Sequence, residues 1–202
     1  MNFPLKLVLI RHSTTAGNLA GQYIGKTDQP LCSEGIDLAK SAATSMPQVK
    51  RVYRSPMLRC RQTAALLYPD HIAHEVPDLR EADFGICEGK TYAQLAADPD
   101  YQEWIASAGA LPPPGGEGAA YFSKRCVSAF YSILKELARD DIPCAACVIH
   151  GGSIMAIMTA LASPKRHFYD WRVENCCGFI VDADPQSGQL VLLEDLRIKC
   201  KV

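Results

Sequence analysis

The sequence predicts an α/β protein with three layers (α/β/α) and a mainly parallel sheet, for two reasons. Short apolar runs alternate along the chain with longer segments of helical periodicity. The run at residues 5–10 is apolar almost throughout, as expected for a strand covered on both faces. Strands that alternate with helices favour parallel pairing, with helices packed on both sides of the sheet.

The elements follow in a regular order. Strands are expected at residues 5–10, 49–53, 71–76, 145–149, 178–181 and 190–193, the last two forming a hairpin-like pair. Ser33 is expected to cap one helix, and Ser55-Pro56 to open a second one with a cap residue followed by proline. The longest helix is expected over about residues 117–137, and another from residue 151 through Leu161.

Residues 78–118 have a weaker pattern. Two short helices are expected around residues 92–97 and 101–108, followed by a proline- and glycine-rich stretch at residues 111–118. We interpret this region as an inserted lid or wall on one domain that spans residues 1–202.

Composition narrows the classes of function. Lys and Arg number 21 and Asp and Glu 22, and no charge block stands out, so general binding to nucleic acid or to a membrane surface has no electrostatic support. The apolar run at the N-terminus is too short for a secretory signal, and no stretch approaches the roughly 20 apolar residues that span a bilayer. Nine cysteines without framework spacing are therefore expected to be reduced thiols in the cytoplasm. A monomer and a homodimer are both compatible with the sequence.

Basic and nucleophilic residues follow three of the expected strands. Arg11-His12, the segment Ser55–Arg59 and His150 each come directly after one. Ligands of open α/β sheets bind beyond the carboxyl ends of the strands. The sequence therefore predicts that these side chains converge on one site.

These residue types suit phosphate chemistry. A neutral imidazole such as that of His12 can attack phosphorus, and the planar fork of an arginine can hold two phosphate oxygens. Arg59 is expected near a helix N-terminus, which favours anions, and the glycines after His150 allow close approach of the backbone to a ligand. Each residue alone has an ordinary structural explanation; together they favour a phosphate site. A carboxylic acid would protonate the leaving group, and the pattern leaves Glu81 and Asp83 as candidates.

Five sequence blocks, in order, resemble those of the histidine phosphatase superfamily, which includes the phosphoglycerate mutases. The blocks are Arg11-His12-Ser13-Thr14-Thr15 with Asn18, Gly25-x-x-Asp28-x-Pro30-Leu31-x-x-x-Gly35, Ser55-Pro56-Met57-Leu58-Arg59-x-x-Gln62-Thr63-Ala64, Leu79-x-Glu81-x-x-Phe84-Gly85-x-x-Glu88-Gly89 and Val148-Ile149-His150-Gly151-Gly152. The resemblance covers most of the chain and implies a phosphoglycerate mutase-like fold.

The resemblance also implies the roles of individual residues. His12 would be the nucleophile that becomes phosphohistidine, and Glu81 the general acid and base. Arg11, Arg59 and His150 would bind the phosphate, with Asn18 as an added contact. These cationic groups would supply the positive charge, so no metal or other cofactor is expected.

The expected substrate is a small phosphorylated metabolite. Short members without a large insertion are usually phosphatases, and Gly116-Glu117-Gly118-x-x-x-Phe122-x-x-Arg125 and Trp171-Arg172-Val173-Glu174-Asn175-Cys176 resemble parts of α-ribazole phosphatases. That resemblance makes α-ribazole 5′-phosphate, an intermediate of cobalamin nucleotide-loop assembly, the leading candidate. Glu117 would either contact substrate hydroxyls or cap the long helix, and Gly151 is a further candidate for a substrate contact.

Two departures from the family pattern bear on function. Ser13 and Thr14 replace the usual Gly and Glu after the nucleophile, and Ile24 stands where mutase-like members often carry a hydroxyl residue. The second departure argues against mutase chemistry. A broad-specificity sugar-phosphate or phosphoglycerate phosphatase, a mutase and a non-catalytic binder of phosphorylated ligands are the alternatives.

A metal-binding or redox module is a further alternative, because Cys144-x-x-Cys147-x-x-His150 has the spacing of metal ligands. A structural zinc site needs a fourth ligand, and Cys147 and His150 would point to opposite faces of a strand. A redox role would need a thiol at a helix N-terminus, whereas this pair lies in or before a strand. Buried thiols are the favoured interpretation.

Overall fold

The computed structural model describes residues 4–107 and 110–197. Seven strands form one sheet in the order β3-β2-β4-β1-β6-β7-β5. The strands are β1 (Leu5–Arg11), β2 (Arg51–Arg54), β3 (Ala73–Glu75), β4 (Cys144–Ile149), β5 (Ala162–Ser163), β6 (Gly178–Ala183) and β7 (Leu190–Leu196). Strands β3, β2, β4 and β1 pair in parallel, whereas β6 is antiparallel to both β1 and β7. The predicted mainly parallel sheet and the terminal antiparallel pair are confirmed.

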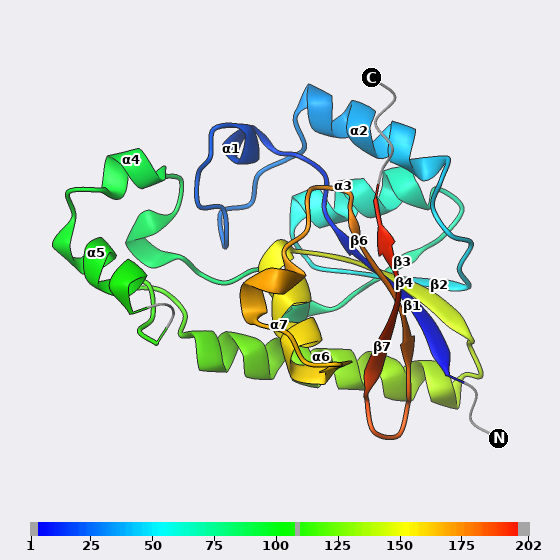
Figure 1. Ribbon diagram of the computed structural model, residues 1–202. Coiled ribbons are helices and arrows are strands. Elements are labelled where there is room, and N and C mark those ends of the chain that lie inside the picture. The colour runs from blue at the N-terminus through cyan, green and yellow to red at the C-terminus, as the bar shows by residue number, and fades with distance from the viewer. Residues whose placement is uncertain (1–3, 108–109, 198–202) are drawn as a thin grey trace.

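Helices cover both faces of the sheet (Figure 1). They are α1 (Ala16–Leu19), α2 (Ser33–Ala43), α3 (Leu58–Leu67), α4 (Tyr92–Leu95), α5 (Pro99–Ala106), α6 (Ala119–Arg139) and α7 (Gly151–Leu161), with short 3₁₀ turns η1 (Pro77–Leu79), η2 (Gly85–Cys87) and η3 (Phe168–Trp171). In Figure 1, α2 and α3 lie above the sheet and α6 and α7 below it, which confirms the three-layer prediction. Among the described residues, no helix is both long and apolar enough to span a bilayer.

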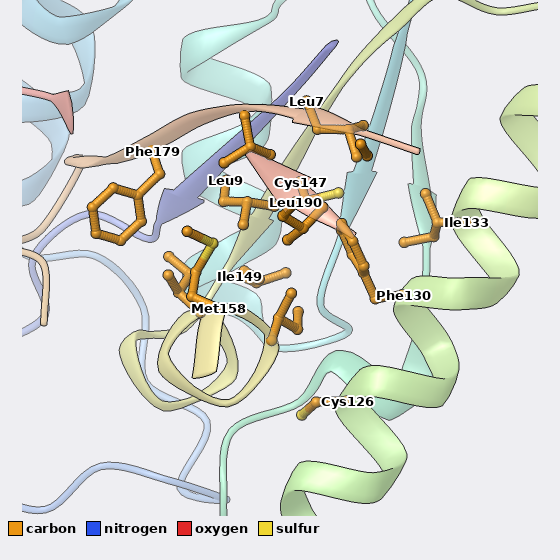
Figure 2. Packing of buried hydrophobic residues seen from close by; sticks show 14 of the residues in the cluster. Leu7, Leu9, Cys126, Phe130, Ile133, Cys147, Ile149, Met158, Phe179 and Leu190 are labelled. Atoms are coloured by element: carbon orange, nitrogen blue, oxygen red, sulfur yellow. The ribbon is translucent and has the colours of Figure 1, made fainter. Parts of the chain in front are cut away.

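Alternating side chains of the central strands fill two separate cores. Leu7 and Leu9 of β1 pack toward α6 and α7, and Val8 and Ile10 pack toward α2 and α3. Figure 2 shows the first core, in which strand side chains meet Phe130 of α6. A strand with two buried faces must be apolar at nearly every position, which explains the continuous apolar run in the sequence.

The caps of helices α2 and α3 differ from prediction. The N-cap of α2 is Cys32 without a side-chain bond, because the hydroxyl of Ser33 donates to the carboxylate of Glu34 instead. Helix α3 begins at Leu58 rather than at Ser55-Pro56. A carboxylate oxygen of Asp28, from a distant loop, accepts from the N–H of Leu58 at 2.7 Å and so caps this helix.

The predicted lid region contains α4 and α5, which project to one side of the sheet (left in Figure 1). It has a small core of its own: Cys87, Leu95 and Tyr101 are buried, with Phe84 and Trp104 packed against them. Tyr23 joins this core from the main body, and its hydroxyl lies 2.8 Å from that of Tyr101. The region predicted to be a lid is therefore attached to the loop that follows α1.

Candidate active site

The carboxyl ends of three neighbouring parallel strands bring the predicted site residues together. Strands β2, β4 and β1 are adjacent, and they are followed by Ser55, His150 and His12. The backbone N–H of His12 donates to Ile149 at 2.8 Å, so the two histidine segments run side by side. The ring centroids of His12 and His150 are 5.2 Å apart. The convergence expected from the sequence is present.

The imidazole of His12 is held in one orientation. Its Nδ1 lies 2.6 Å from the carbonyl oxygen of Ser13, and because a carbonyl only accepts, Nδ1 carries the proton. The other ring nitrogen, Nε2, then has a free lone pair. Burial, followed by the positive charges of Arg59 and Arg11, lowers the pKa of His12 well below its usual 6.5. The ring is therefore neutral near pH 7, as a nucleophile must be.

Arg59 lies in the first turn of α3 with its side chain fully buried. Its Nη1 and Nη2 donate to the carbonyls of Thr27 and Gly25 at 2.9 and 2.8 Å. Its Nε–H is buried and has no hydrogen-bond partner within the described residues. A buried donor without a partner is costly unless a ligand accepts from it, so this N–H points to an anion site.

Arg11 supplies the second guanidinium. Its Nη1 donates to the carbonyl of Val173 at 2.8 Å, which ties the segment after η3 to the end of β1. Burial lowers the pKa of Arg11, opposed by the charges of Glu81 and Glu174. Two arginines beside one neutral imidazole make the surroundings of His12 strongly attractive to a phosphate dianion.

The loop that holds Arg59 is organised by Glu88. The carboxylate of Glu88 accepts from the backbone N–H groups of residues 25–27 at 3.1, 2.9 and 3.2 Å, and from the hydroxyl of Thr27. It also accepts from the N–H of Phe84 at 3.0 Å. Although burial acts in the opposite direction, these bonds lower the pKa of Glu88, so the group stays ionised. Glu88 thereby fixes the carbonyls that orient the guanidinium of Arg59.

His150 is fully buried at the N-cap of α7. Its Nε2 lies 2.7 Å from the hydroxyl of Ser55, and the thiol of Cys60 is 3.5 Å from the same nitrogen. Burial, followed by Arg59, lowers the pKa of His150 well below 6.5. Gly151, the next residue, lies beside Arg11: an added Cβ would be 3.6 Å from the Cδ and Nε of that arginine.

The structure distinguishes the two candidates for the general acid. Asp83 forms an ion pair with Lys26 at 2.9 Å, and this bond lowers its pKa although burial opposes the shift. Glu81 instead accepts from the backbone N–H groups of Gly152 and Ala82, both at 3.0 Å. Burial raises the pKa of Glu81 above 4.5, more than these bonds and the arginines lower it. Glu81 is therefore the carboxyl suited to hold a proton beside the two histidines.

Asn18 closes another side of the site. Its amide oxygen accepts from the N–H of Thr15 at 3.2 Å and from the amide of Asn175 at 3.3 Å. Because the oxygen is engaged, the amide N–H groups are the part of Asn18 that could bind a phosphate. Asn175 also donates to the carbonyl of His12 at 2.9 Å. These contacts of Asn175 with Asn18 and His12 were not predicted. The only indication in the sequence was the position of Asn175 within the segment at residues 171–176.

Ser13, one of the two departures from the family pattern, is accommodated within the fold. Its hydroxyl donates to the carbonyl of Gly35 at 2.6 Å, and its backbone N–H donates to the hydroxyl of Thr63 at 2.9 Å. The residue is fully buried between α2 and α3. The serine therefore ties the loop after His12 to both helices.

Glu117 is paired rather than free. Its two carboxylate oxygens accept from Nε and Nη2 of Arg125 at 2.7 and 2.6 Å. The N-cap of α6 is Gly118, so Glu117 precedes the helix and does not cap it. The alternative of a contact with substrate hydroxyls stays a prediction.

The metal or redox alternative gains no support from the fold. Cys147 is fully buried in the core that faces α6, where burial raises the pKa of its thiol to about 12. Across the described ranges, no group of three or more potential ligand residues is positioned to hold a metal ion. Cys144 and Cys147 are free thiols, as are the other described cysteines.

Comparisons with known proteins agree with this arrangement. Residues 7–196 match the model of the histidine phosphatase superfamily (branch 1). The adenosylcobalamin/alpha-ribazole phosphatase of Salmonella typhimurium is 32% identical over 185 residues, which cover 88% of this chain and 90% of that protein.

Two solved structures are similar throughout. The alpha-ribazole phosphatase from Shigella flexneri has a TM-score of 0.84 at 27% identity and covers 98% of this chain and 99% of its own. The phosphoserine phosphatase from Entamoeba histolytica, solved with 3-phosphoglyceric acid, has a TM-score of 0.79 at 26% identity and covers 96% of this chain and 98% of its own. The chain belongs to the histidine phosphatase superfamily.

Proposed function

We propose that the chain hydrolyses small phosphate monoesters through a phosphohistidine on His12. The observation that carries this proposal is the hydrogen bond from Nδ1 of His12 to the Ser13 carbonyl, at 2.6 Å. It leaves the lone pair of Nε2 free to attack. A protein that only bound phosphorylated ligands would need the arginines but not a neutral, oriented imidazole with a carboxylic acid nearby.

In the first step, Nε2 of His12 bonds to phosphorus while the bond from phosphorus to the ester oxygen breaks. Protonated Glu81 gives its proton to that oxygen, so the substrate leaves as an alcohol. The His12 ring becomes positively charged, and the Ser13 carbonyl at Nδ1 stabilises this charge. Arg11, Arg59 and His150 stabilise the charge on the phosphoryl oxygens.

In the second step, water attacks the phosphoryl group and displaces Nε2 of His12. The Glu81 carboxylate takes the proton of that water, which restores the acid for the next cycle. Inorganic phosphate then leaves. In the free enzyme His150 is neutral because burial lowers its pKa; a bound dianion favours its protonated form and would strengthen its hold on phosphate.

For the substrate we propose α-ribazole 5′-phosphate as the leading candidate. The similarity to the alpha-ribazole phosphatases of Salmonella typhimurium and Shigella flexneri over nearly the whole chain supports this choice. So do the segments at residues 116–125 and 171–176, which resemble the corresponding parts of that group. Two residues of these segments contact the site. Glu117 pairs with Arg125, which also binds the carbonyl of Glu81, and Asn175 donates to the carbonyl of His12.

A second candidate substrate class is phosphoserine or a phosphoglycerate. It is favoured by the likeness to the Entamoeba histolytica phosphoserine phosphatase, which was solved with 3-phosphoglyceric acid. Mutase activity is less favoured, because Ile24 is a buried apolar side chain packed against Gly17 and offers no hydroxyl to a second phosphate group.

The test is a screen of kcat/KM over α-ribazole 5′-phosphate, phosphoserine, 3-phosphoglycerate, sugar phosphates and nucleotides, with the His12→Ala variant as control. The proposal expects hydrolysis that the variant lacks, with the highest kcat/KM on α-ribazole 5′-phosphate. A higher value on phosphoserine would select the second class. Transfer of phosphate between the hydroxyls of phosphoglycerate, dependent on bisphosphoglycerate, would identify a mutase. Binding of these compounds without turnover would refute an enzymatic role.

A further inference from the structure

A buried ion pair lies beneath the segment that carries Glu81. Arg125 of α6 is only 6% exposed, and its partner Glu117 directly precedes that helix. Nε and Nη2 of Arg125 donate to the two carboxylate oxygens of Glu117, which is the bidentate geometry that suits these two groups. The pair thus fixes the plane of the guanidinium.

The remaining N–H groups of Arg125 bind the backbone that leads into the general acid. Its Nη1 donates to the carbonyls of Asp78 and Arg80 at 2.7 and 2.8 Å, and its Nη2 donates to the carbonyl of Glu81 at 3.1 Å. With the bonds to Glu117, all five donors of the guanidinium are used. Arg125 therefore holds three backbone positions, ending at Glu81 itself.

This support matters because residues 81–84 belong to no helix or strand. No ladder of backbone hydrogen bonds places the Cα of Glu81. Its carboxyl group, in turn, accepts from the N–H of Gly152 at 3.0 Å, across the site. A shift of the backbone at residue 81 would break that contact and move the acid away from the ester oxygen, and small displacements of catalytic groups are costly.

We infer that Glu117 and Arg125 form a positioning device for the general acid: Arg125 fixes the backbone of residues 78–81, and Glu117 fixes Arg125. The inference rests on the proposed hydrolysis through His12 and Glu81. Neither residue touches the reacting atoms. The role differs from a direct contact of Glu117 with substrate, because both carboxylate oxygens are already engaged.

The test is the dependence of the reaction on its leaving group. Glycerol 2-phosphate releases a basic alkoxide that needs a proton, whereas p-nitrophenyl phosphate releases a stable phenolate that does not. In the variants Glu117→Gln and Glu117→Asp, kcat/KM on glycerol 2-phosphate is expected to fall on the order of tenfold more than on p-nitrophenyl phosphate, since a positioned acid is worth about 10²–10⁴ in rate. Because both substrates report on the same active molecules, the ratio does not depend on the fraction that folds.

Glu136→Gln is the matched control. Glu136 also pairs with an arginine, Arg51, at 2.8 Å, and it lies on the same helix, about 16 Å from Arg125 at 1.5 Å per residue. This control should leave the ratio of the two substrates at the wild-type value. The mild variant Glu117→Asp keeps the charge and provides measurable activity if Glu117→Gln folds poorly.

The outcomes separate the two proposals. An unchanged ratio in Glu117→Asp, or equal losses on both substrates in Glu117→Gln, would overturn the positioning role while leaving the phosphatase intact. An increase of KM for α-ribazole 5′-phosphate with kcat unchanged would instead assign Glu117 to a substrate contact, and it would also overturn the positioning role. Wild-type protein that hydrolyses neither substrate would refute the proposed function itself.

Discussion

Replacing Gly152 by alanine places a methyl group where the carboxyl group of Glu81, the proposed general acid, lies. A Cβ at this position would be 2.3 Å from Oε1 of Glu81 and 3.0 Å from its Cδ. Ordinary contacts of a carbon with these atoms begin at about 3.5 Å, so the carboxyl must move by roughly an ångström. It would then lose the hydrogen bond from the Gly152 N–H, which measures 3.0 Å.

The expected loss follows from these contacts. A hydrogen bond to the neutral, protonated acid contributes about 0.5–1.5 kcal/mol, and general acid catalysis by a correctly placed group contributes about 10²–10⁴ in rate. We therefore expect kcat/KM of Gly152→Ala on glycerol 2-phosphate to fall about 10²-fold, equivalent to about 2.7 kcal/mol of barrier. On p-nitrophenyl phosphate the loss should stay below about tenfold, because that leaving group needs little help from an acid.

The assay compares both substrates in the wild type, in Gly152→Ala and in Gly118→Ala. Gly118 is the matched control, since a Cβ there meets nothing within 4 Å. The second position of α7 tolerates alanine as a helix former, so Gly152→Ala is expected to fold. Wild-type rates for Gly152→Ala on glycerol 2-phosphate, or equal losses on both substrates, would refute the argument that Glu81 is the acid held at this N–H.

Further predictions concern the nucleophile, the phosphate site and pH. His12→Ala should abolish turnover, whereas EDTA should leave wild-type activity unchanged; retained activity in the variant would refute the nucleophile, and loss with EDTA would refute the metal-independent mechanism. Glu88→Gln should raise the Ki of inorganic phosphate about tenfold, because the backbone N–H groups of residues 25–27, whose carbonyls orient Arg59, lose a charged acceptor; an unchanged Ki would show that Glu88 does not act through Arg59. As the pH is raised, kcat/KM on glycerol 2-phosphate should first increase, with a midpoint below pH 6.5, because His12, whose pKa is lowered, loses its proton. It should then decrease, with a midpoint above pH 4.5, because Glu81, whose pKa is raised, ionises and can no longer act as an acid. On p-nitrophenyl phosphate, whose leaving group needs little help from an acid, the alkaline fall should be much smaller than on glycerol 2-phosphate, while the rise that reports His12 is unchanged; an equal alkaline fall on both substrates would assign it to another group.

Much of the site could be predicted because its main residues follow strands. His12 and His150 come directly after apolar runs, and parallel strands bring such positions to one edge of the sheet. The helical periodicity of residues 117–137 likewise predicted the long helix α6, which buries Phe122, Phe130 and Leu137 in the core. The local sequence pattern is enough to predict a residue's position where that position follows directly from the strand or helix that carries the residue.

The parts that could not be predicted depend on partners far apart in the chain. Asp28 caps α3 from a separate loop, so the start of that helix was placed two residues too early. The hydroxyl of Ser55, which looked like a cap, lies against His150 instead. The sequence pattern did not predict the five hydrogen bonds that Glu88 makes with residues 25–27 and Phe84. Tertiary contacts decide such roles, and the local sequence does not encode them.

The choice between Glu81 and Asp83 also depends on contacts with residues far away in the chain. Both are carboxylates in one irregular segment, and spacing alone treats them alike. Lys26 neutralises Asp83 from a distant loop, whereas burial and the N–H of Gly152 leave Glu81 beside the histidines with a raised pKa. The environment, and not the residue type, favours Glu81 as the proposed acid.

The most direct measurement is the trapping of the covalent intermediate. Wild-type protein and substrate would be mixed and quenched in base within the first turnover, and the phosphorylated residue identified by mass spectrometry and its nitrogen by ³¹P NMR. We expect phosphate on Nε2 of His12, since Nδ1 is occupied by the Ser13 carbonyl at 2.6 Å. Phosphate on Nδ1 or on another residue, or hydrolysis without any phosphoprotein when breakdown is the slow step, would contradict the mechanism.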